Sequence, residues 1–288
     1  MPHPTSFVQR FLLEELDIRG AVVQLTDVWQ SLQKDRLYPS AVSALFGEMV
    51  AVCALLTGNL KQAGRLTFQL SGQGPVSLMV VDCNHELNLR GYARCGHLST
   101  SLTDLPSLVG DGRLMLTLDT PDMREPYRSF VPIEGAGLNA VFEHYLAQSE
   151  QQPAGLWLCA NEQTAAGLFI QKLPGADMKD LDGWTRIQQL ANTVRDEELR
   201  TLSPQALLTR LFHEEAVRLY DPRPITHRTA PDWDKVRTML RQLGESEVRE
   251  ILAEKGEVIV SDELSNQHYR FSEADVDALF ENGNPTLH

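Results

Sequence analysis

The sequence contains only four cysteines, and their positions exclude the usual cysteine-based sites. They are Cys53, Cys83, Cys95 and Cys159, so no C-x-C or C-x-x-C pair occurs in the 288 residues. No short cluster of cysteine and histidine has the spacing of zinc ligands. We therefore expect four small, buried, apolar side chains in a protein from a reducing compartment.

Motifs of the common enzyme classes are missing as well. The chain has no Walker P-loop, no G-x-G-x-x-G and no G-x-S-x-G elbow. His85 and Glu86 are followed by Leu89 where a zinc protease helix carries its second histidine. Residues 180–183 resemble part of a calcium loop but lack its first and last ligands. The sequence thus predicts no catalytic residue, no metal site and no cofactor, and an enzyme would need a site that these patterns miss.

Positive charge and long apolar runs are scarce. The chain has 26 Lys and Arg against 39 Asp and Glu, a net charge of −13, whereas duplex nucleic acid and anionic membranes attract clustered cations. The longest uninterrupted apolar run, Met49–Leu56, has eight residues, and about 20 are needed to span a bilayer. The first residues lack the basic and apolar regions of a secretory signal. We expect a soluble, cytoplasmic protein with no nucleic-acid or membrane partner.

Alternating helical and strand patterns fill residues 1–175. Helical spacing of apolar residues predicts helices over 26–32, 40–58 and 138–149, with Ser40 as a cap. The connections between the expected strands are too short for crossover helices, which predicts a mostly antiparallel sheet. Gly72 and Gly74 are expected to supply positive-φ positions in a hairpin turn. The expected strands are 66–70, 76–82, 87–95, 114–118, 156–160 and 166–172.

A more polar helical segment follows over residues 176–224. Ser203 and Pro204 are typical of a helix start, with serine as the cap. Short helices need tertiary packing to be stable, so their apolar stripes are expected to be packed against the rest of the protein. The stripes consist of Trp184, Ile187 and Leu190, and of Leu207, Leu208, Leu211 and Phe212.

Residues 225–288 have the pattern of a small α+β unit. Helices are predicted over 232–243 and 245–255, each ended by a glycine, and Ser272 is expected to cap a last helix. Residues 257–260 and 267–271 are predicted to pair as a hairpin. The expected fold class is α+β: a large mixed α/β N-terminal core, 1–175, with a mostly antiparallel sheet, a helical linker, 176–224, and a small α+β C-terminal domain, 225–288.

Short motifs spread over the whole chain resemble those of one known family, the redox-regulated 33-kDa heat-shock chaperones. Each motif is weak by itself, but together and in this order they are specific. They are 17–20 (DIRG), 55–61 (LLTGNLK), 89–94 (LRGYAR), 108–112 (LVGDG), 149–153 (SEQQP), 165–167 (AAG), 171–174 (QKLP), 210–215 (RLFHEE), 220–222 (YDP), 251–257 (ILAEKGE) and 268–271 (HYRF).

The resemblance implies a chaperone core, a helical linker and a C-terminal redox domain that holds zinc with four cysteines. Alignment on the 220–222 and 268–271 motifs places those four positions at Thr229, Pro231, Asp262 and Ser265. None is cysteine, and no cysteine lies beyond Cys159. The spacing of His227, Asp262 and His268 matches no replacement site. We therefore predict a member of the family that lacks the zinc-binding cysteines and carries no zinc.

The resemblance also implies the function of an ATP-independent holdase, which binds unfolding proteins and prevents their aggregation. Its partners would be unfolded or partly folded client proteins, and its active form could be a homodimer. Client capture requires apolar surface, and a soluble resting state must hide that surface. The seven residues of the linker stripes are the predicted client-binding or regulatory positions. The alternative is a degenerate relative that keeps the fold and serves one specific, non-chaperone partner.

A disulfide switch is not expected from the remaining cysteines. The pair closest in sequence is Cys83 and Cys95, on either side of a predicted turn at 84–86. Cys83 should then face a residue near Leu87 and Cys95 one near Pro75, about 26 Å apart along the strands. A disulfide requires Cα atoms within about 7 Å. Regulation is therefore predicted to be independent of cysteine.

Overall fold

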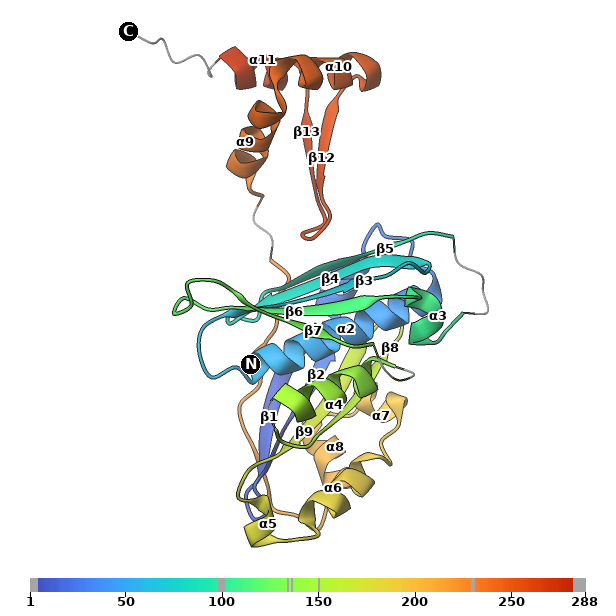
Figure 1. Cartoon of the computed structure of the whole chain (residues 1–288), viewed down its shortest axis with the longest axis vertical. Coiled ribbons are helices and arrows are strands. Elements are labelled where there is room, and N and C mark those ends of the chain that lie inside the picture. The colour runs from blue at the N-terminus through green and yellow to red at the C-terminus, as the bar shows by residue number, and fades with distance from the viewer. Residues whose placement is uncertain are drawn as a thin grey trace. The chain divides into compact units, whose positions relative to one another are not determined.

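The structure is a computed structural model that describes residues 5–97, 102–133, 135, 137–149, 151–228 and 231–281. Thr229, one of the four positions aligned with zinc ligands, lies outside the described residues. The chain divides into two compact units, residues 1–227 and 228–288 (Figure 1). The fold class is α+β, with mostly antiparallel sheets.

The first unit contains a six-stranded antiparallel sheet whose two faces are both apolar. Its order is β10-β1-β2-β9-β8, and β11 also pairs with β1. The strands β1 and β2 were not expected from the sequence, because almost every residue of β2 is buried and the alternation of polar and apolar residues is lost. The strands are β1 (Ser6–Leu13), β2 (Ile18–Leu25), β8 (Ala154–Ala160), β9 (Ala165–Lys172), β10 (Val217–Leu219) and β11 (Arg223–Pro224).

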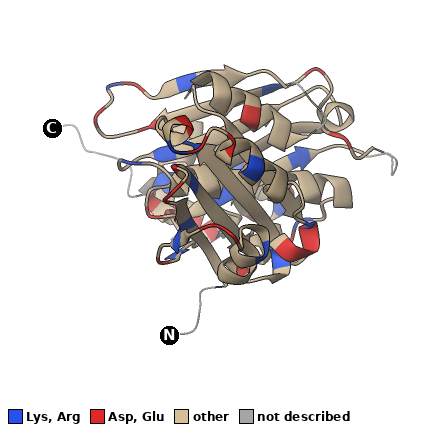
Figure 2. Cartoon of the chain, turned by 90° about the horizontal axis from the view of Figure 1, so that it is seen from below, with Lys and Arg blue, Asp and Glu red and all other residues tan. Residues whose placement is uncertain are grey.

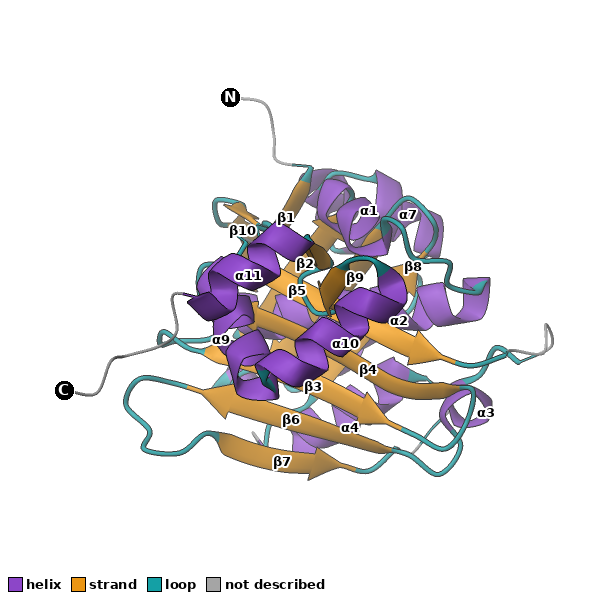
Figure 3. Ribbon diagram, turned by 90° about the horizontal axis from the view of Figure 1, so that it is seen from above, coloured by secondary structure: helices purple, strands orange, loops and turns teal. Residues whose placement is uncertain are grey.

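A second sheet of five antiparallel strands, in the order β5-β4-β3-β6-β7, lies opposite the first (Figure 3). Four of its strands were expected, and the edge strand β7 was not. The strands are β3 (Arg65–Ser71), β4 (Val76–Asn84), β5 (Leu89–Cys95), β6 (Arg113–Asp119) and β7 (Tyr127–Val131).

The helix α2 (Ser40–Gly58) lies between the two sheets and contacts both. By length and composition it could cross a bilayer, yet most of it is buried inside the protein, which is the setting of a core helix. The prediction that Ser40 caps it was wrong: Pro39 occupies the N-cap position, and no side chain caps the helix. The shorter helices α1 (Asp27–Gln33), α3 (Leu105–Val109) and α4 (Leu138–Ser149) complete this part, and the Phe142 ring of α4 packs 4.8 Å from that of Phe68.

The hairpin between β3 and β4 was predicted correctly, but the reason given for its glycines was wrong. Neither Gly72 nor Gly74 has a positive φ. Instead, a Cβ atom at Gly72 would lie 2.3 Å from the carbonyl oxygen of Val109, and one at Gly74 would lie 2.6 Å from that of Leu108. The glycines are required because the end of α3 lies against the turn, a contact that no local pattern shows.

Four short helices follow β9, and the last three pack on the face of the six-stranded sheet that α2 does not cover (Figure 1). We call them the linker helices: α5 (Ala176–Lys179), α6 (Gly183–Ala191), α7 (Asp196–Thr201) and α8 (Pro204–Leu211). The predicted cap of the last is confirmed, since the Ser203 side chain accepts a hydrogen bond from the Ala206 amide at 3.2 Å. Viewed from below, the first unit shows acidic and basic residues interspersed (Figure 2).

The second unit has its own apolar core, and its predicted helices and hairpin are confirmed. Gly256 ends a helix in the left-handed conformation, with φ of 77°. Ser272 and Asp275 cap the last helix reciprocally, through hydrogen bonds of 2.9 and 3.4 Å to each other's amides. The elements are α9 (Trp233–Leu243), α10 (Glu245–Lys255), β12 (Val258–Asp262), β13 (Gln267–Phe271) and α11 (Glu273–Glu281).

The close approach at Gly72 gives a testable prediction about stability. Gly72→Ala should lower the free energy of unfolding by about 1–3 kcal/mol, because the added methyl group collides with backbone that cannot yield. Gly96→Ala is the matched control, since a Cβ atom there meets nothing within 4 Å. Urea denaturation of the two variants measures the difference, and equal stabilities would contradict the proposed contact.

Candidate functional site: the covered face of the six-stranded sheet

The linker helices and the sheet beneath them form an apolar cluster separate from the one around α2. The sheet contributes residues that point away from α2, and the linker helices contribute their apolar stripes. The central members are Phe11, Leu13, Ile18, Val22, Leu168 and Ile170 from the sheet, with Ile187, Ala191, Leu199, Leu207, Leu208, Leu211 and Phe212 from the linker side. The Phe11 and Phe212 rings pack 6.3 Å apart across this boundary.

The structure brings all seven of the linker residues predicted from the sequence into this one cluster. Five of them are at most 2% exposed, and Trp184 and Leu190 pack on the cluster while partly buried. The sheet side of the site was missed. Phe11 and Leu13 in β1, and Ile18 and Val22 in β2, follow the period of two expected for one strand face. That signal was hidden because the alternate residues, such as Val23, are equally apolar and face α2.

Few polar contacts attach the linker helices to the sheet. The buried Gln24 amide donates hydrogen bonds to the carbonyl oxygens of Leu199 and Leu202, at 2.8 and 2.7 Å, and so holds the end of α7. Lys179 pairs with Asp17 at 2.7 Å, but both side chains are substantially exposed, and such pairs contribute only about 0–1 kcal/mol. Lys172 also pairs with Asp177 at 2.6 Å, and the Trp157 indole donates a hydrogen bond to the Asn192 side chain at 3.1 Å. Apolar burial, the Gln24 amide and these contacts together attach the linker helices to the sheet.

The two ends of the linker are held more firmly than its middle, because backbone pairing fixes them. The Leu173 amide bonds to the carbonyl of Asp17 at 2.9 Å. After the last helix, β10 and β11 pair with β1, and Thr226 exchanges backbone hydrogen bonds of 2.9 and 2.8 Å with Leu87 and Leu89. The helices between these ends contact the sheet mainly through side chains, so they can separate from it while both ends stay paired.

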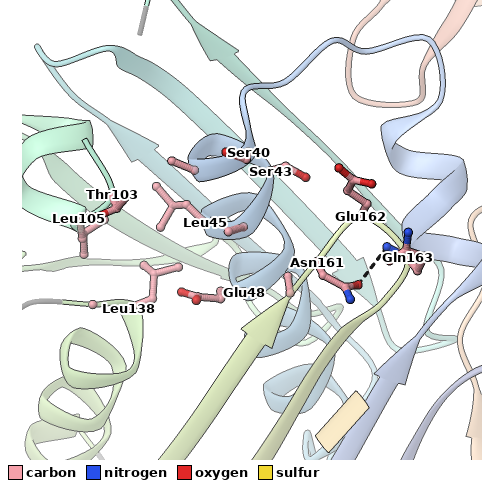
Figure 4. A pocket seen from close by; sticks show the side chains of 14 residues that line it. Ser40, Ser43, Leu45, Glu48, Thr103, Leu105, Leu138, Asn161, Glu162 and Gln163 are labelled. Atoms are coloured by element: carbon pink, nitrogen blue, oxygen red, sulfur yellow. Dashed lines mark hydrogen bonds between the residues drawn. The ribbon is translucent and has the colours of Figure 1, made fainter. Parts of the chain in front are cut away.

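A cavity of about 590 Å³ lies at one edge of the covered sheet, and the Glu48 side chain lines it (Figure 4). Its other walls include Ser40, Leu105, Leu138 and Asn161. Burial, and to a lesser extent the negative charge of Asp196, raises the pKa of Glu48 to about 7. Glu48 belongs to α2 and Asp196 begins α7, so two carboxylates lie near each other where the core meets the linker helices.

The buried cysteine Cys159 lies at the same boundary. Its thiol donates a weak hydrogen bond to the Asp196 carbonyl oxygen at 3.6 Å. Burial, with the charge of Asp196, raises the pKa of Cys159 to about 12. A thiol with so high a pKa is almost entirely protonated at neutral pH, and therefore reacts slowly with oxidants.

The other two strand cysteines lie close to their expected partners. Cys83 pairs with Leu89, two residues beyond Leu87, and Cys95 pairs with Val76, next to Pro75. The six residues from Leu89 to Cys95 place the two thiols about 20 Å apart along the sheet, somewhat less than expected and still far beyond the reach of a disulfide.

The cysteine pair that does come together, Cys53 and Cys83, was missed because it joins a helix to a strand. The Cys53 thiol donates to the Leu66 carbonyl oxygen at 3.7 Å, and Leu66 is directly opposite Cys83 in the sheet. Burial raises the pKa of Cys83 to about 12 and that of Cys53 well above its ordinary value. Both thiols are fully buried in the core.

The positions aligned with the zinc ligands do not fit a zinc site. Pro231 has no side-chain donor atom, and the Asp262 carboxylate accepts hydrogen bonds from the Leu264 and Ser265 amides at 3.1 and 3.4 Å, which closes the hairpin turn. Structural zinc requires four nitrogen or sulfur ligands, mostly thiolates. Over the described part of the chain, no group of three or more His, Cys, Asp or Glu residues could hold a metal ion.

Comparison with known proteins places this architecture in a family. The family model described as Hsp33 protein matches residues 6–272. This chain belongs to the Hsp33 family. It is 39% identical over 277 residues to the 33 kDa chaperonin of Methylobacillus flagellatus, covering 95% of this chain and 94% of that protein. It is 38% identical over 276 residues to the 33 kDa chaperonin of a Shewanella species, strain W3-18-1, covering 96% of each.

The Hsp33 fold is also confirmed by a solved structure. The crystal structure of the 33 kDa chaperonin from Thermotoga maritima superposes with a TM-score of 0.82 and covers 97% of this chain and all of that one, at 20% identity. The resemblance seen in the sequence motifs is therefore confirmed, and so is the fold class. The family is one of chaperones and not of enzymes, which supports a chaperone role for this chain and argues against an overlooked catalytic site.

The raised pKa of Glu48 predicts how the stability of this Hsp33 protein depends on pH. The folded state keeps the Glu48 proton up to a pH of about 7, whereas an unfolded chain loses it near pH 4.3. Stability from this group is therefore fully present at low pH and is lost as the pH rises toward about 7. Glu48→Gln should remove this loss and stabilise the protein at pH 8 by about 1–3 kcal/mol.

The measurement is the free energy of unfolding, together with hydrogen exchange of the α7 amides, at pH 5.5 and pH 8. Glu86→Gln is the matched control, because Glu86 is exposed on a turn. Equal changes in the pH dependence of the free energy of unfolding in Glu48→Gln and Glu86→Gln would contradict the raised pKa of Glu48.

Proposed function

We propose that the protein is an ATP-independent holdase that captures unfolding proteins on the face of the six-stranded sheet that the linker helices cover. The observation that carries this proposal is the cluster of buried apolar residues shared by the sheet and the linker helices. The names of its relatives as 33 kDa chaperonins support it. In this proposal residues 1–175 are the chaperone core, 176–224 the linker and 225–288 the C-terminal domain, in a cytoplasmic protein.

The physical basis is that the linker helices are too short to be stable without the sheet. They have only four, nine, six and eight residues, and isolated helices shorter than about 12–15 residues are marginal in water. Separation from the sheet would cost them their helical structure as well as their apolar contacts. The opening is thus a local transition, with a lower free energy than unfolding the core around α2.

The trigger is proposed to differ from the zinc and disulfide switch that the family resemblance implies. The cysteines of this chain lie in β4, β5, β8 and α2, none in the second unit. Direct thermal destabilisation of the linker helices needs no thiol. The opened form would expose a large apolar face, which clients, or a second copy of the chain in a homodimer, would cover.

A rival function is a partner-specific interaction protein that keeps the fold without general chaperone activity. The observation in its favour is the replacement of the four sensor cysteines, which removes the switch implied by the family resemblance. It predicts one stoichiometric partner and no protection of unrelated proteins, so the experiment below separates the two functions.

The holdase proposal predicts that weaker linker packing lowers the temperature at which clients are protected. Leu207 is fully buried in the apolar cluster between α8 and the sheet. Leu207→Ala should lower the free energy that holds the linker helices on the sheet by about 2–5 kcal/mol. Leu181→Ala is the matched control, because Leu181 lies in the same linker and is 80% exposed. Light scattering of two unrelated heat-denatured clients, with and without ATP, measures protection.

We expect Leu207→Ala to suppress aggregation at a lower temperature than the parent protein and Leu181→Ala to behave like the parent. ATP should change nothing. Aggregation of both clients at full extent in the presence of the parent protein, or suppression that required ATP hydrolysis, would rule out the holdase and leave the partner-specific function.

Zinc content provides a separate prediction. We expect the purified protein to bind far less than one zinc ion per chain, because the aligned positions lack thiolates. The second unit should keep its helices in the presence of a chelator, since its core is built from apolar side chains such as Val236, Leu240, Val248 and Val276. Metal analysis and circular dichroism before and after chelation test this, and about one zinc per chain with chelator-induced loss of helicity would contradict it.

A further inference from the structure

The face of the six-stranded sheet that the linker helices cover carries a buried polar side chain, that of Gln24. Gln24 lies near the end of β2, with Ala166 of β9 opposite it on one side and Phe7 of β1 opposite it on the other. All three residues are at most 9% exposed. Val22, two residues earlier on the same face, belongs to the apolar cluster of the site. A polar group in such surroundings is costly unless it has a hydrogen-bond partner.

The Gln24 amide group finds its partners in the linker. Its nitrogen donates hydrogen bonds to the carbonyl oxygens of Leu199 and Leu202, at 2.8 and 2.7 Å. Both partners can only accept, which fixes the orientation of the amide group. The two carbonyl groups belong to the last turn of α7 and to the residue that ends it, where a helix leaves its own carbonyl oxygens unpaired. The sheet therefore supplies donors to main-chain groups of the helices that cover it.

Two further donors on the strands of this face also meet main-chain carbonyl groups of the linker. The amide nitrogen of Gln9 in β1 donates to the Tyr220 carbonyl oxygen at 2.7 Å. The Cys159 thiol in β8 donates weakly to the Asp196 carbonyl oxygen at 3.6 Å. Together with the contacts of Gln24, these bonds hold the linker through peptide groups, which every polypeptide carries whatever its sequence.

Opening of the linker changes the surroundings of Gln24 and leaves those of Gln9 unchanged. Leu199 and Leu202 belong to the part of the linker that separates from the sheet in the proposed holdase function. Tyr220 stays in place, because β10 and β11 pair with β1 on either side of it. The freed Gln24 amide is then hydrated. A ligand that covers this amide without accepting a hydrogen bond from it leaves a buried donor unpaired, which is unfavourable.

We propose that Gln24 selects polypeptide clients by donating hydrogen bonds to their main-chain carbonyl oxygens, in place of those of Leu199 and Leu202. The inference rests on the proposed holdase function and names the chemical group that its site recognises besides apolar side chains. The ligand class is a segment with apolar side chains and with carbonyl groups that its own secondary structure leaves unpaired, as in an unfolding protein. An alkyl chain can cover the same apolar face but offers no acceptor. Gln24 is thus a specificity-determining residue, because a site with a buried donor rejects ligands that lack the acceptor.

A role limited to linker docking is the alternative, since the same two hydrogen bonds hold α7 on the sheet. That role alters how readily the linker opens, so it changes the binding of every ligand of the covered face by the same factor. Selection of carbonyl groups instead changes the affinity for a peptide relative to the affinity for an alkyl chain. The ratio of the two affinities therefore distinguishes the two roles.

The test uses the full chain and two uncharged fluorescent probes: a ten-residue peptide of alternating leucine and serine, and a twelve-carbon alkyl chain. Fluorescence anisotropy is measured for each variant at a temperature at which hydrogen exchange shows the α8 amides open and the α2 amides protected. The main variant is Gln24→Met, which keeps the length of the side chain and removes its donor. Gln9→Met is the matched control, because Gln9 keeps its Tyr220 partner when the linker opens. Circular dichroism checks that each variant is folded.

We expect the parent protein to bind the peptide at least about tenfold more tightly than the alkyl probe. Gln24→Met should weaken peptide binding about fivefold, because a hydrogen bond is lost, and strengthen alkyl binding about fivefold, because no buried donor is left unpaired. The ratio of peptide affinity to alkyl affinity should therefore fall about 25-fold in Gln24→Met. In Gln9→Met the ratio should stay within about twofold of that of the parent protein.

An unchanged ratio in Gln24→Met would assign Gln24 to linker docking alone and overturn the proposal. Equal falls of the ratio in Gln24→Met and Gln9→Met would also overturn it, because the Gln9 amide is not freed by opening. A parent protein that bound the alkyl probe as tightly as the peptide would contradict the proposal without any variant. Failure of the holdase function is a different result, in which the opened parent protein binds neither probe and both clients aggregate at full extent.

Discussion

The structure depends on one constraint: the six-stranded sheet is apolar on both faces, and each face must be kept from water. The helix α2 covers one face permanently, because it is also the core helix of the five-stranded sheet. The other face is covered by helices of four to nine residues that cannot be stable by themselves. Sheet and linker helices therefore stabilise each other, and the loss of either exposes the other.

This mutual dependence explains why the attachments are unevenly distributed. Backbone pairing fixes the two ends of the linker, through β9 at one end and through β10 and β11 at the other. Between them the Gln24 amide makes the buried polar contact, and the Lys179–Asp17 and Lys172–Asp177 ion pairs lie nearer the start of the linker. In the proposed mechanism, heating increases the contribution of conformational entropy that favours opening, and the paired ends keep the linker attached to the core.

The two sheets present different chemistry to their surroundings. The six-stranded sheet buries apolar side chains under the linker helices, and in the proposed function the exposed face captures unfolded chains regardless of sequence. The five-stranded sheet packs one face on α2 and leaves the alternate residues of β3 partly exposed. Three of the four thiols, those of Cys53, Cys83 and Cys159, are buried as expected in the core or beneath α7, and burial raises their pKa values. The expectation of burial was wrong for Cys95, which is only partly buried on the edge strand β5.

The sequence by itself determined the local elements and the family. The pattern of α2, the strands β3–β6, the cap at Ser203 and the C-terminal helices follow from spacing and capping residues, which act within a few positions of the chain. The linker half of the candidate site was found in the same way, from the apolar stripe at 207–212. Only the tertiary structure decided the rest, since β2 is buried on both faces and loses the alternation that marks a strand. The contact of Gly72 with Val109, the proximity of Cys53 to Cys83 and the effect of Asp196 on the pKa of Glu48 all involve residues distant in sequence. Such contacts depend on which surfaces meet, and a local pattern carries no information about its partner.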